Sequence, residues 1–135
     1  MIVIDASALS KYLLREEGWE HVESYLAKGT YSLDHVVKEV GNAIWKHYAI
    51  RKIISLDLAL ELFKALKRLI DDEVIKIENQ DAYIDKAMEI ALEHAITLYD
   101  ALYVAQALRH GELLTCDRKQ YEIAKALGIR VYFIE

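Results

Sequence analysis

Proline is absent from this chain, cysteine occurs once, and no apolar run is long enough to span a bilayer. The single cysteine, Cys116, excludes an internal disulfide and a cysteine-based zinc site, and we interpret it as a small buried hydrophobic residue. No pair among the five histidines has the spacing of a helical zinc motif, so we interpret them as surface or boundary residues. The opening residues, Met1–Asp5, lack a basic region and reach a carboxylate too early for a signal peptide. We therefore expect a cytoplasmic protein without a membrane partner.

Linkers and repeats are also missing. No stretch rich in glycine, proline or serine divides the 135 residues, and no segment is repeated. Hydrophobic residues make up 54% of the chain and charged residues 29%, which is enough to bury a core and keep a polar surface. We expect one domain over residues 1–135.

The net charge of −5 limits the ligands that the surface suits. A protein that binds nucleic acid over a broad surface usually carries a basic patch, so the charge argues against that class. It does not exclude a nuclease, because bound cations reverse the local charge of an acidic site.

Short apolar, β-branched runs alternate with helical stretches. This alternation predicts an α/β fold in which helices cover a parallel sheet, and strands that are apolar throughout fit burial on both faces. The predicted strands are Ile2–Asp5, Thr30–Leu33, Val74–Ile77, Leu113–Cys116 and Arg130–Ile134. The predicted helices are Ala8–Leu14, Trp19–Lys28, Asp34–Lys52, Leu56–Asp71, Asp81–His94, Tyr99–Arg109 and Lys119–Leu127.

Four acidic residues lie at separate joints between these elements. Asp5 ends the first apolar run, Asp117 follows the fourth, Asp100 opens a helix, and Glu39 lies within one. On a helical wheel of about 100° per residue, Glu39 and Asp100 fall at the margins of apolar stripes. Carboxylates in these positions can point into one crevice at the carboxyl edge of a parallel sheet. There they repel each other and favour Mg²⁺ or Mn²⁺, which would support metal-assisted cleavage of a phosphodiester.

Each acid also has a purely structural explanation. Asp5 can cap the helix that follows it. Asp117, with Gln120 three residues later, has the pattern of a capping box. Asp100 can complement a helix dipole, and Glu39 can be a solvated helix residue. A cap can also orient a ligand, so the two explanations are compatible.

Four segments carry a family resemblance in their order and spacing: Val3–Leu9, Glu39–Ala43, Leu98–Ala105 and Leu114–Asp117. Through them the chain resembles, over essentially its whole length, the PIN-domain ribonucleases and in particular the small VapC-type toxins of VapBC toxin–antitoxin pairs. The resemblance implies a PIN-like three-layer α/β/α sandwich with a parallel sheet of four to five strands. It also implies an endoribonuclease that uses Mg²⁺ or Mn²⁺, cleaves RNA, binds a small VapB-type antitoxin and forms a homodimer.

The resemblance also assigns roles to residues. The catalytic acids are Asp5, Glu39, Asp100 and Asp117. Because Mg²⁺ needs only one or two direct carboxylates, we expect the metal ligands to be Asp5, at the centre, with Asp100 or Asp117 beside it, while Glu39 binds through water or orients the nucleophile. Supporting roles fall to two hydroxyls and an amide, those of Ser7, Thr115 and Asn42. From their positions near the acids, we expect basic residues to contact RNA phosphates or the antitoxin, with a solvated surface as the alternative. These are Lys11, Arg15 and Arg118, together with Lys46 and Lys119.

Several aromatic residues fall on helices near apolar faces. We expect the tyrosines among them to lie in the core or a subunit interface, with base stacking as the alternative. These are Tyr12, Tyr48, Tyr99 and Tyr103. Trp19 and Trp45 are interpreted as core residues or as anchors for a partner.

Two other functions stay open at this point. One is a PIN-domain nuclease that processes ribosomal or transfer RNA precursors, and the other is a catalytically inactive RNA-binding or scaffold module. The presence of all four acids argues against the inactive module. Receiver domains and haloacid-type phosphatases do not fit, because Ala6 and Ser7 follow Asp5 where those classes need a further acid.

Overall fold

Five short strands form one parallel sheet in the computed structural model, which describes residues 1–135. The strands are β1 (Ile2–Ile4), β2 (Thr30–Leu33), β3 (Ile75–Glu78), β4 (Glu112–Thr115) and β5 (Arg130–Phe133). Their order across the sheet is β3-β2-β1-β4-β5. All five predicted strands are confirmed to within one residue at each end.

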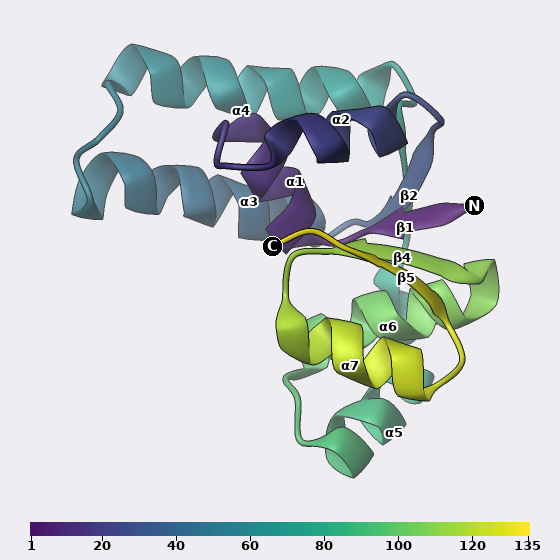
Figure 1. Ribbon diagram of the computed structural model, residues 1–135. Helices are drawn as coiled ribbons and strands as arrows, with labels where there is room; N and C mark the ends of the chain where they lie inside the picture. The colour runs from purple at the N-terminus through teal and green to yellow at the C-terminus, as the bar shows by residue number, and fades with distance from the viewer.

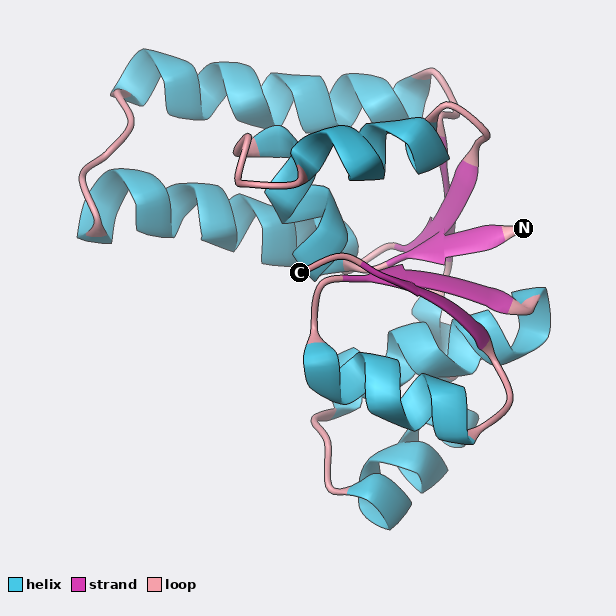
Figure 2. Cartoon of the chain, viewed as in Figure 1, coloured by secondary structure: helices cyan, strands magenta, loops and turns pink.

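Helices cover both faces of the sheet (Figures 1 and 2). One layer contains α1 (Ala6–Leu13), α2 (Trp19–Leu26), α3 (Val36–Trp45) and α4 (Leu56–Asp71). The other contains α5 (Ile84–His94), α6 (Leu98–His110) and α7 (Arg118–Ala126). A 3₁₀ turn, η2 (Gln80–Ala82), leads into α5. The predicted three-layer α/β/α sandwich is therefore confirmed.

The strand order reverses at β1. The chain moves outward from β1 through β2 to β3 and then returns to place β4 on the other side of β1, where Ile4 pairs with Leu114. In open parallel sheets, ligands bind at the carboxyl edge where the order reverses. Asp5 follows β1 and Asp117 lies just after β4, so both lie at this edge.

The buried core explains why the central elements are the most apolar. Every residue of β1 is buried, and α6 has seven consecutive buried residues from Ala101 to Ala107. The helix α6 contacts β1, β2 and β4 as well as α5 and α7, so no side of its middle faces solvent. Its first turn, which carries Asp100, is thereby fixed relative to the central strands.

A cluster centred on Glu78 fastens α6 to the end of β3. Its carboxylate accepts hydrogen bonds from Gln106 (2.9 Å), Tyr83 (2.8 Å) and His110 (2.7 Å), and Gln106 also donates to the Ser32 carbonyl. Partial burial alone would raise the pKa of Glu78, but the hydrogen bonds from Gln106, His110 and Tyr83 lower it. A stabilised carboxylate therefore holds α6 in place near its carboxyl end.

Three expectations need correction. His35 and His47 are buried rather than surface residues, because both lie on the inner side of the α3 region. The helix predicted over Asp34–Lys52 becomes a π-helix, η1, at Lys46–Ile50. Trp45 is 52% exposed, which excludes the core interpretation for that residue.

The glycine inside α3 has a packing reason. A side chain at Gly41 would lie 3.3 Å from the ring of Phe63 on α4, so the absent Cβ lets the two helices approach closely. No helix combines the length and the apolar character that crossing a bilayer would require.

Candidate active site

Asp5 is fully buried where β1 passes into α1. It is 0% exposed, and its Oδ1 accepts hydrogen bonds from the Ser7 hydroxyl (2.7 Å) and the Ala8 amide (3.0 Å). Its Oδ2 accepts from the Thr115 hydroxyl at the end of β4 (2.5 Å). The same carboxylate therefore caps α1 and joins the ends of two neighbouring strands.

The two hydroxyls beside Asp5 each donate to its carboxylate and accept from a backbone amide. Ser7 also accepts from the Cys116 amide (2.9 Å), and Thr115 accepts from the Asp117 amide (3.0 Å). Each hydroxyl carries one proton, which it donates to ionised Asp5 at the shorter of its contacts, so the 3.3 Å contact between the hydroxyls is not a hydrogen bond. A carboxylate has about four acceptor positions, and only three are filled here. One position on Oδ2 is left for another ligand.

Glu39 is positioned by two aromatic residues. The Tyr103 hydroxyl donates to Glu39 Oε1 (3.2 Å), and His35 Nε2 lies 2.9 Å from the same oxygen. The imidazole is not aligned for a hydrogen bond, because both of its ring nitrogens are buried without a hydrogen-bond partner. Oε2 of Glu39 accepts no hydrogen bond, so one oxygen is fixed and the other is available.

Gln120 connects the other two acids. Its backbone amide donates to Asp117 Oδ1 (2.9 Å), and its side-chain amide donates to Asp100 Oδ1 (3.1 Å). Asp117 therefore caps α7 as predicted, but the expected capping box is only half formed, because the Gln120 side chain reaches α6 instead of turning back. This link ties the starts of α6 and α7 together.

The four acids act on one another electrostatically. Burial raises the pKa of Asp5 to about 6 against the hydrogen bonds of Thr115, Ala8 and Ser7, and the charge of Asp117 raises it further. Burial also raises the pKa of Asp100, and Asp117 and Glu39 add to that shift. No lysine, arginine or histidine forms an ion pair with these three aspartates. The predicted acids therefore lie close enough to act on one another's charge, and the three aspartates have no ion-pair partner.

This donor set fits a hard divalent cation. Carboxylate oxygens are the ligands that Mg²⁺ prefers, and Asp117 lies close enough to Asp5 to act on its charge. No three acidic, histidine or cysteine side chains are close enough together to enclose an ion directly. A bound Mg²⁺ would therefore take only one or two of these carboxylates directly and keep several waters.

The predicted basic residues have partners of their own. Lys11 Nζ donates to the carbonyls of Glu17 (2.8 Å) and Glu135 (3.2 Å), and Arg118 pairs with the Glu135 carboxylate (2.7 Å). The guanidinium of Arg15 lies over the rings of Tyr12 and Trp19, with centroid distances of 4.8 and 4.1 Å. Two of the three predicted phosphate contacts therefore depend on the position of Glu135.

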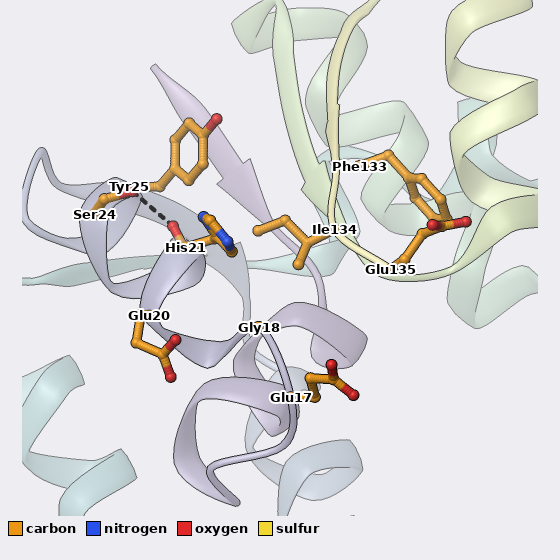
Figure 3. Close-up of a pocket in the computed structure, with 9 residues that line it drawn as sticks. All are labelled: Glu17, Gly18, Glu20, His21, Ser24, Tyr25, Phe133, Ile134 and Glu135. Carbon is orange, nitrogen blue, oxygen red and sulfur yellow. Dashed lines mark hydrogen bonds between the residues drawn. The ribbon is translucent and has the colours of Figure 1, made fainter.

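A pocket lies beside these residues and not at the acids. Its volume is about 700 Å³, and Figure 3 shows its lining on α2 and at the end of the chain after β5. Its lining includes the acidic residues Glu17, Glu20 and Glu135 and none of the four acids. Negative walls disfavour a phosphate, so we place the candidate site at the edge of the sheet and not in this pocket.

The side chains of Asn42 and Cys116 make no hydrogen bond within the chain, although the Cys116 backbone amide donates to Ser7. Asn42 is exposed on α3 and makes no side-chain hydrogen bond, so its supporting role stays a prediction. Cys116 is half-buried, and burial together with Asp5 raises the pKa of its thiol to about 12. A neutral thiol of this kind is not a nucleophile.

The sequence profile of the family described as "PIN domain" matches residues 2–126. The chain belongs to the PIN-domain family. This PIN domain is of the VapC type. It is 35% identical over 129 residues to the protein named Ribonuclease VapC3 of Pyrobaculum aerophilum, and the alignment covers 93% of this chain and 96% of that protein. It is 29% identical over 126 residues to Exonuclease VapC9 of the same organism, covering 93% and 86% of the two chains.

A solved structure has the same fold. FitAcB from Neisseria gonorrhoeae superimposes on this PIN domain with a TM-score of 0.63 at 19% identity, covering 98% of this chain and 96% of that one. At this identity the likeness supports the architecture alone.

Three residues of the site were not assigned there from the sequence: His35, Tyr103 and Gln120. Their spacing was a signal, because His35 precedes Glu39 by four residues, and Tyr103 and Gln120 each follow an acid by three. On a helix, residues three or four apart share a face.

The raised pKa of Asp5 gives a prediction about stability in the absence of metal. The buried carboxyl is protonated in both states below its ordinary pKa of 3.8, so its contribution is complete there and is lost as the pH rises through about 6. Asp5→Asn cannot ionise. In chelator, its free energy of unfolding relative to wild type should rise by about 3 kcal/mol between pH 3.5 and pH 7. Urea denaturation at the two pH values measures this, and a difference independent of pH would contradict it.

Proposed function

We propose that this PIN domain is a divalent-cation-dependent endoribonuclease and the toxin of a VapBC-type toxin–antitoxin pair. The observation that carries the proposal is the electrostatic coupling of Asp5, Glu39, Asp100 and Asp117, of which the three aspartates have no ion-pair partner. The similarity of this PIN domain to Ribonuclease VapC3 over 93% of the chain supports RNA as the substrate.

In this proposal Asp5, Asp100 and Asp117 hold Mg²⁺ or Mn²⁺. A bound ion of this kind lowers the pKa of a coordinated water and withdraws charge from the leaving oxygen. The chain itself supplies orientation. Ser7 and Thr115 fix Asp5 by donating to both of its oxygens, and Gln120 fixes Asp100 and Asp117. Tyr103 fixes one oxygen of Glu39, and the other oxygen would orient a water.

The cations beside the acids complete the proposed RNA site. Lys11 lies on α1, the helix that Asp5 caps, and would contact a phosphate bound at the acids. Arg118 directly follows Asp117. A phosphate that took the place of Glu135 would accept hydrogen bonds from both Lys11 and Arg118. Arg15 is farther along α1 and would contact the flanking strand. Asn42, exposed after Glu39, would contact the substrate.

An exonuclease is the second candidate, because one relative carries that name. A free end is required for an exonuclease and not for an endonuclease, so a circular substrate separates the two. Precursor processing differs in target rather than in chemistry. The inactive scaffold is opposed by the presence of all four acids in one network.

We assign the protein partners to the exposed apolar side chains of the arm formed by α3, η1 and α4. Eight large side chains there are at least 38% exposed: Trp45, Tyr48, Ile50, Ile53, Leu56, Leu58, Leu60 and Phe63. A concentration of this kind marks a protein interface. The proposed partners are a second copy of the chain and a small VapB-type antitoxin, and the proposed setting is a single-domain protein of the cytoplasm.

Cleavage should require the metal and Asp5. With Mg²⁺ or Mn²⁺ the protein should cut a circular single-stranded RNA, and chelator should stop the reaction. Asp5→Asn should lower the rate by about a hundredfold or more, because several kcal/mol of charge stabilisation depend on the metal. Gel analysis of the products measures this.

Asp71→Asn is the matched control, since Asp71 is an exposed carboxylate at the end of α4 and should leave the rate unchanged. Cutting that persists in chelator would refute the metal mechanism. Degradation of linear RNA with an intact circle would favour the exonuclease.

A toxin should slow growth through its catalytic site. Expression of wild type should reduce the growth rate of a host, Asp5→Asn should not, and co-expression of the short protein encoded beside this gene should restore growth. Growth curves of the three strains measure this. Equal growth with wild type and Asp5→Asn would favour the processing or scaffold functions.

A homodimer through the apolar arm should depend on its exposed side chains. Light scattering at micromolar concentration should give twice the 15.6 kDa mass for wild type and a smaller mass for Ile53→Asp. Leu92→Asp, at a 73% exposed residue of α5 outside the arm, is the control. A monomeric wild type would contradict the dimer.

A further inference from the structure

Tyr99 is a large aromatic residue left in solvent at the edge of the acidic site. It is 64% exposed, although Ala101 and the six residues that follow are buried. It directly precedes Asp100 in the first turn of α6. Its hydroxyl makes no hydrogen bond within the chain, and its one aromatic contact, with His35, leaves most of the ring exposed.

The ring of Tyr99 belongs to a row of three rings that ends at Glu39. Tyr99 meets His35 edge-on, with centroids 5.9 Å apart at 65°, and His35 packs against Tyr103 at 4.8 Å. Tyr103 and His35 both reach the Glu39 carboxylate. One imidazole therefore separates the exposed ring from an acid of the site.

His35 supports this row as a ring and not through hydrogen bonds. It is 7% exposed, and neither of its nitrogens has a hydrogen-bond partner. Because it is enclosed between two tyrosines, it cannot move away from Tyr99 without disturbing Tyr103. A single edge contact orients the Tyr99 ring and leaves most of its surface open.

The other tyrosines considered for base stacking lack this combination. Tyr103 is fully buried, and Tyr12 is covered by Arg15 and Trp19. Tyr48 is 40% exposed but lies on η1, outside the network of the four acids. Tyr99 alone among them joins high exposure with a position beside a catalytic acid.

We propose that Tyr99 is a stacking platform for one unpaired nucleobase of the RNA strand, next to the phosphate that is cut. This inference rests on the proposed function and deepens it, since it selects single-stranded RNA: bases inside a duplex are already stacked and do not expose a face. Stacking on an aromatic side chain is tolerant of base identity. The platform therefore selects strandedness and not sequence.

Binding to a short, fluorescently labelled single-stranded RNA tests the platform apart from catalysis. The measurement uses the Asp5→Asn protein with Mg²⁺, which should bind without cutting. Adding Tyr99→Ala should weaken the affinity roughly ten- to hundredfold, the range expected for loss of one base stack. Tyr99→Phe and Tyr99→Trp should keep the affinity within about twofold, because the ring is retained. Leu92→Ala is the control, because Leu92 is 73% exposed on α5 and lies outside both the site and the apolar arm; it should leave the RNA affinity unchanged.

A single abasic nucleotide, moved stepwise along the strand, locates the contact. At one position it should weaken binding to the Tyr99 protein by the same factor as Tyr99→Ala and cause no further loss in the Tyr99→Ala protein. Such coupling is the mark of two groups that touch each other. Affinity for a fully paired duplex should be equal in both proteins.

Three results would overturn the platform. The first is equal RNA affinity with and without Tyr99→Ala, and the second is a loss of affinity in Tyr99→Phe as large as in Tyr99→Ala. The third is a changed molecular mass of the Tyr99→Ala protein with unchanged RNA affinity, which would make Tyr99 a protein contact. Failure of the proposed nuclease function would give a different result from failure of the platform. A wild type that never cuts RNA, together with a tenfold loss on Tyr99→Ala, would remove the nuclease and keep the platform.

Discussion

The burial of one carboxylate, Asp5, constrains the rest of this molecule. It lies at the end of the central strand, where it accepts from Ser7 and Ala8 at the start of α1 and from Thr115 at the end of β4. These contacts fix the carboxyl edges of two neighbouring strands and the direction of the first helix. They are also the contacts that hold an ionisable group in a place where its charge is unfavourable.

Structural and chemical roles coincide at this site. Asp5 and Asp117 are helix caps and acids of the cluster at once, and Gln120 serves a cap through its backbone and an acid through its side chain. A cap fixes one oxygen of a carboxylate and leaves the other available. The fold therefore orients its acids with the interactions that begin its helices, and it tolerates their repulsion because a divalent cation can offset it.

The helix α6 transmits the order of the core to the site. Its buried middle packs on three strands, and Glu78 holds its far end through Gln106 and His110. Its first turn then presents Asp100 to the cluster, Tyr103 to Glu39 and Tyr99 to solvent. Acid, positioning residue and exposed ring come from five consecutive residues, so a shift of α6 would change all three together.

The sequence by itself determined the strands, the three layers and the four acids, because apolar runs and the residues that end them are local features. It left open which groups hold those acids. Three of these contacts join segments that are far apart in the chain. The Gln120 side chain donates to Asp100, His35 is buried between two tyrosines, and Glu135 accepts from Lys11 and Arg118. Only the packing of helices on both faces of the sheet decided them, since a side chain's partners depend on which distant element arrives beside it.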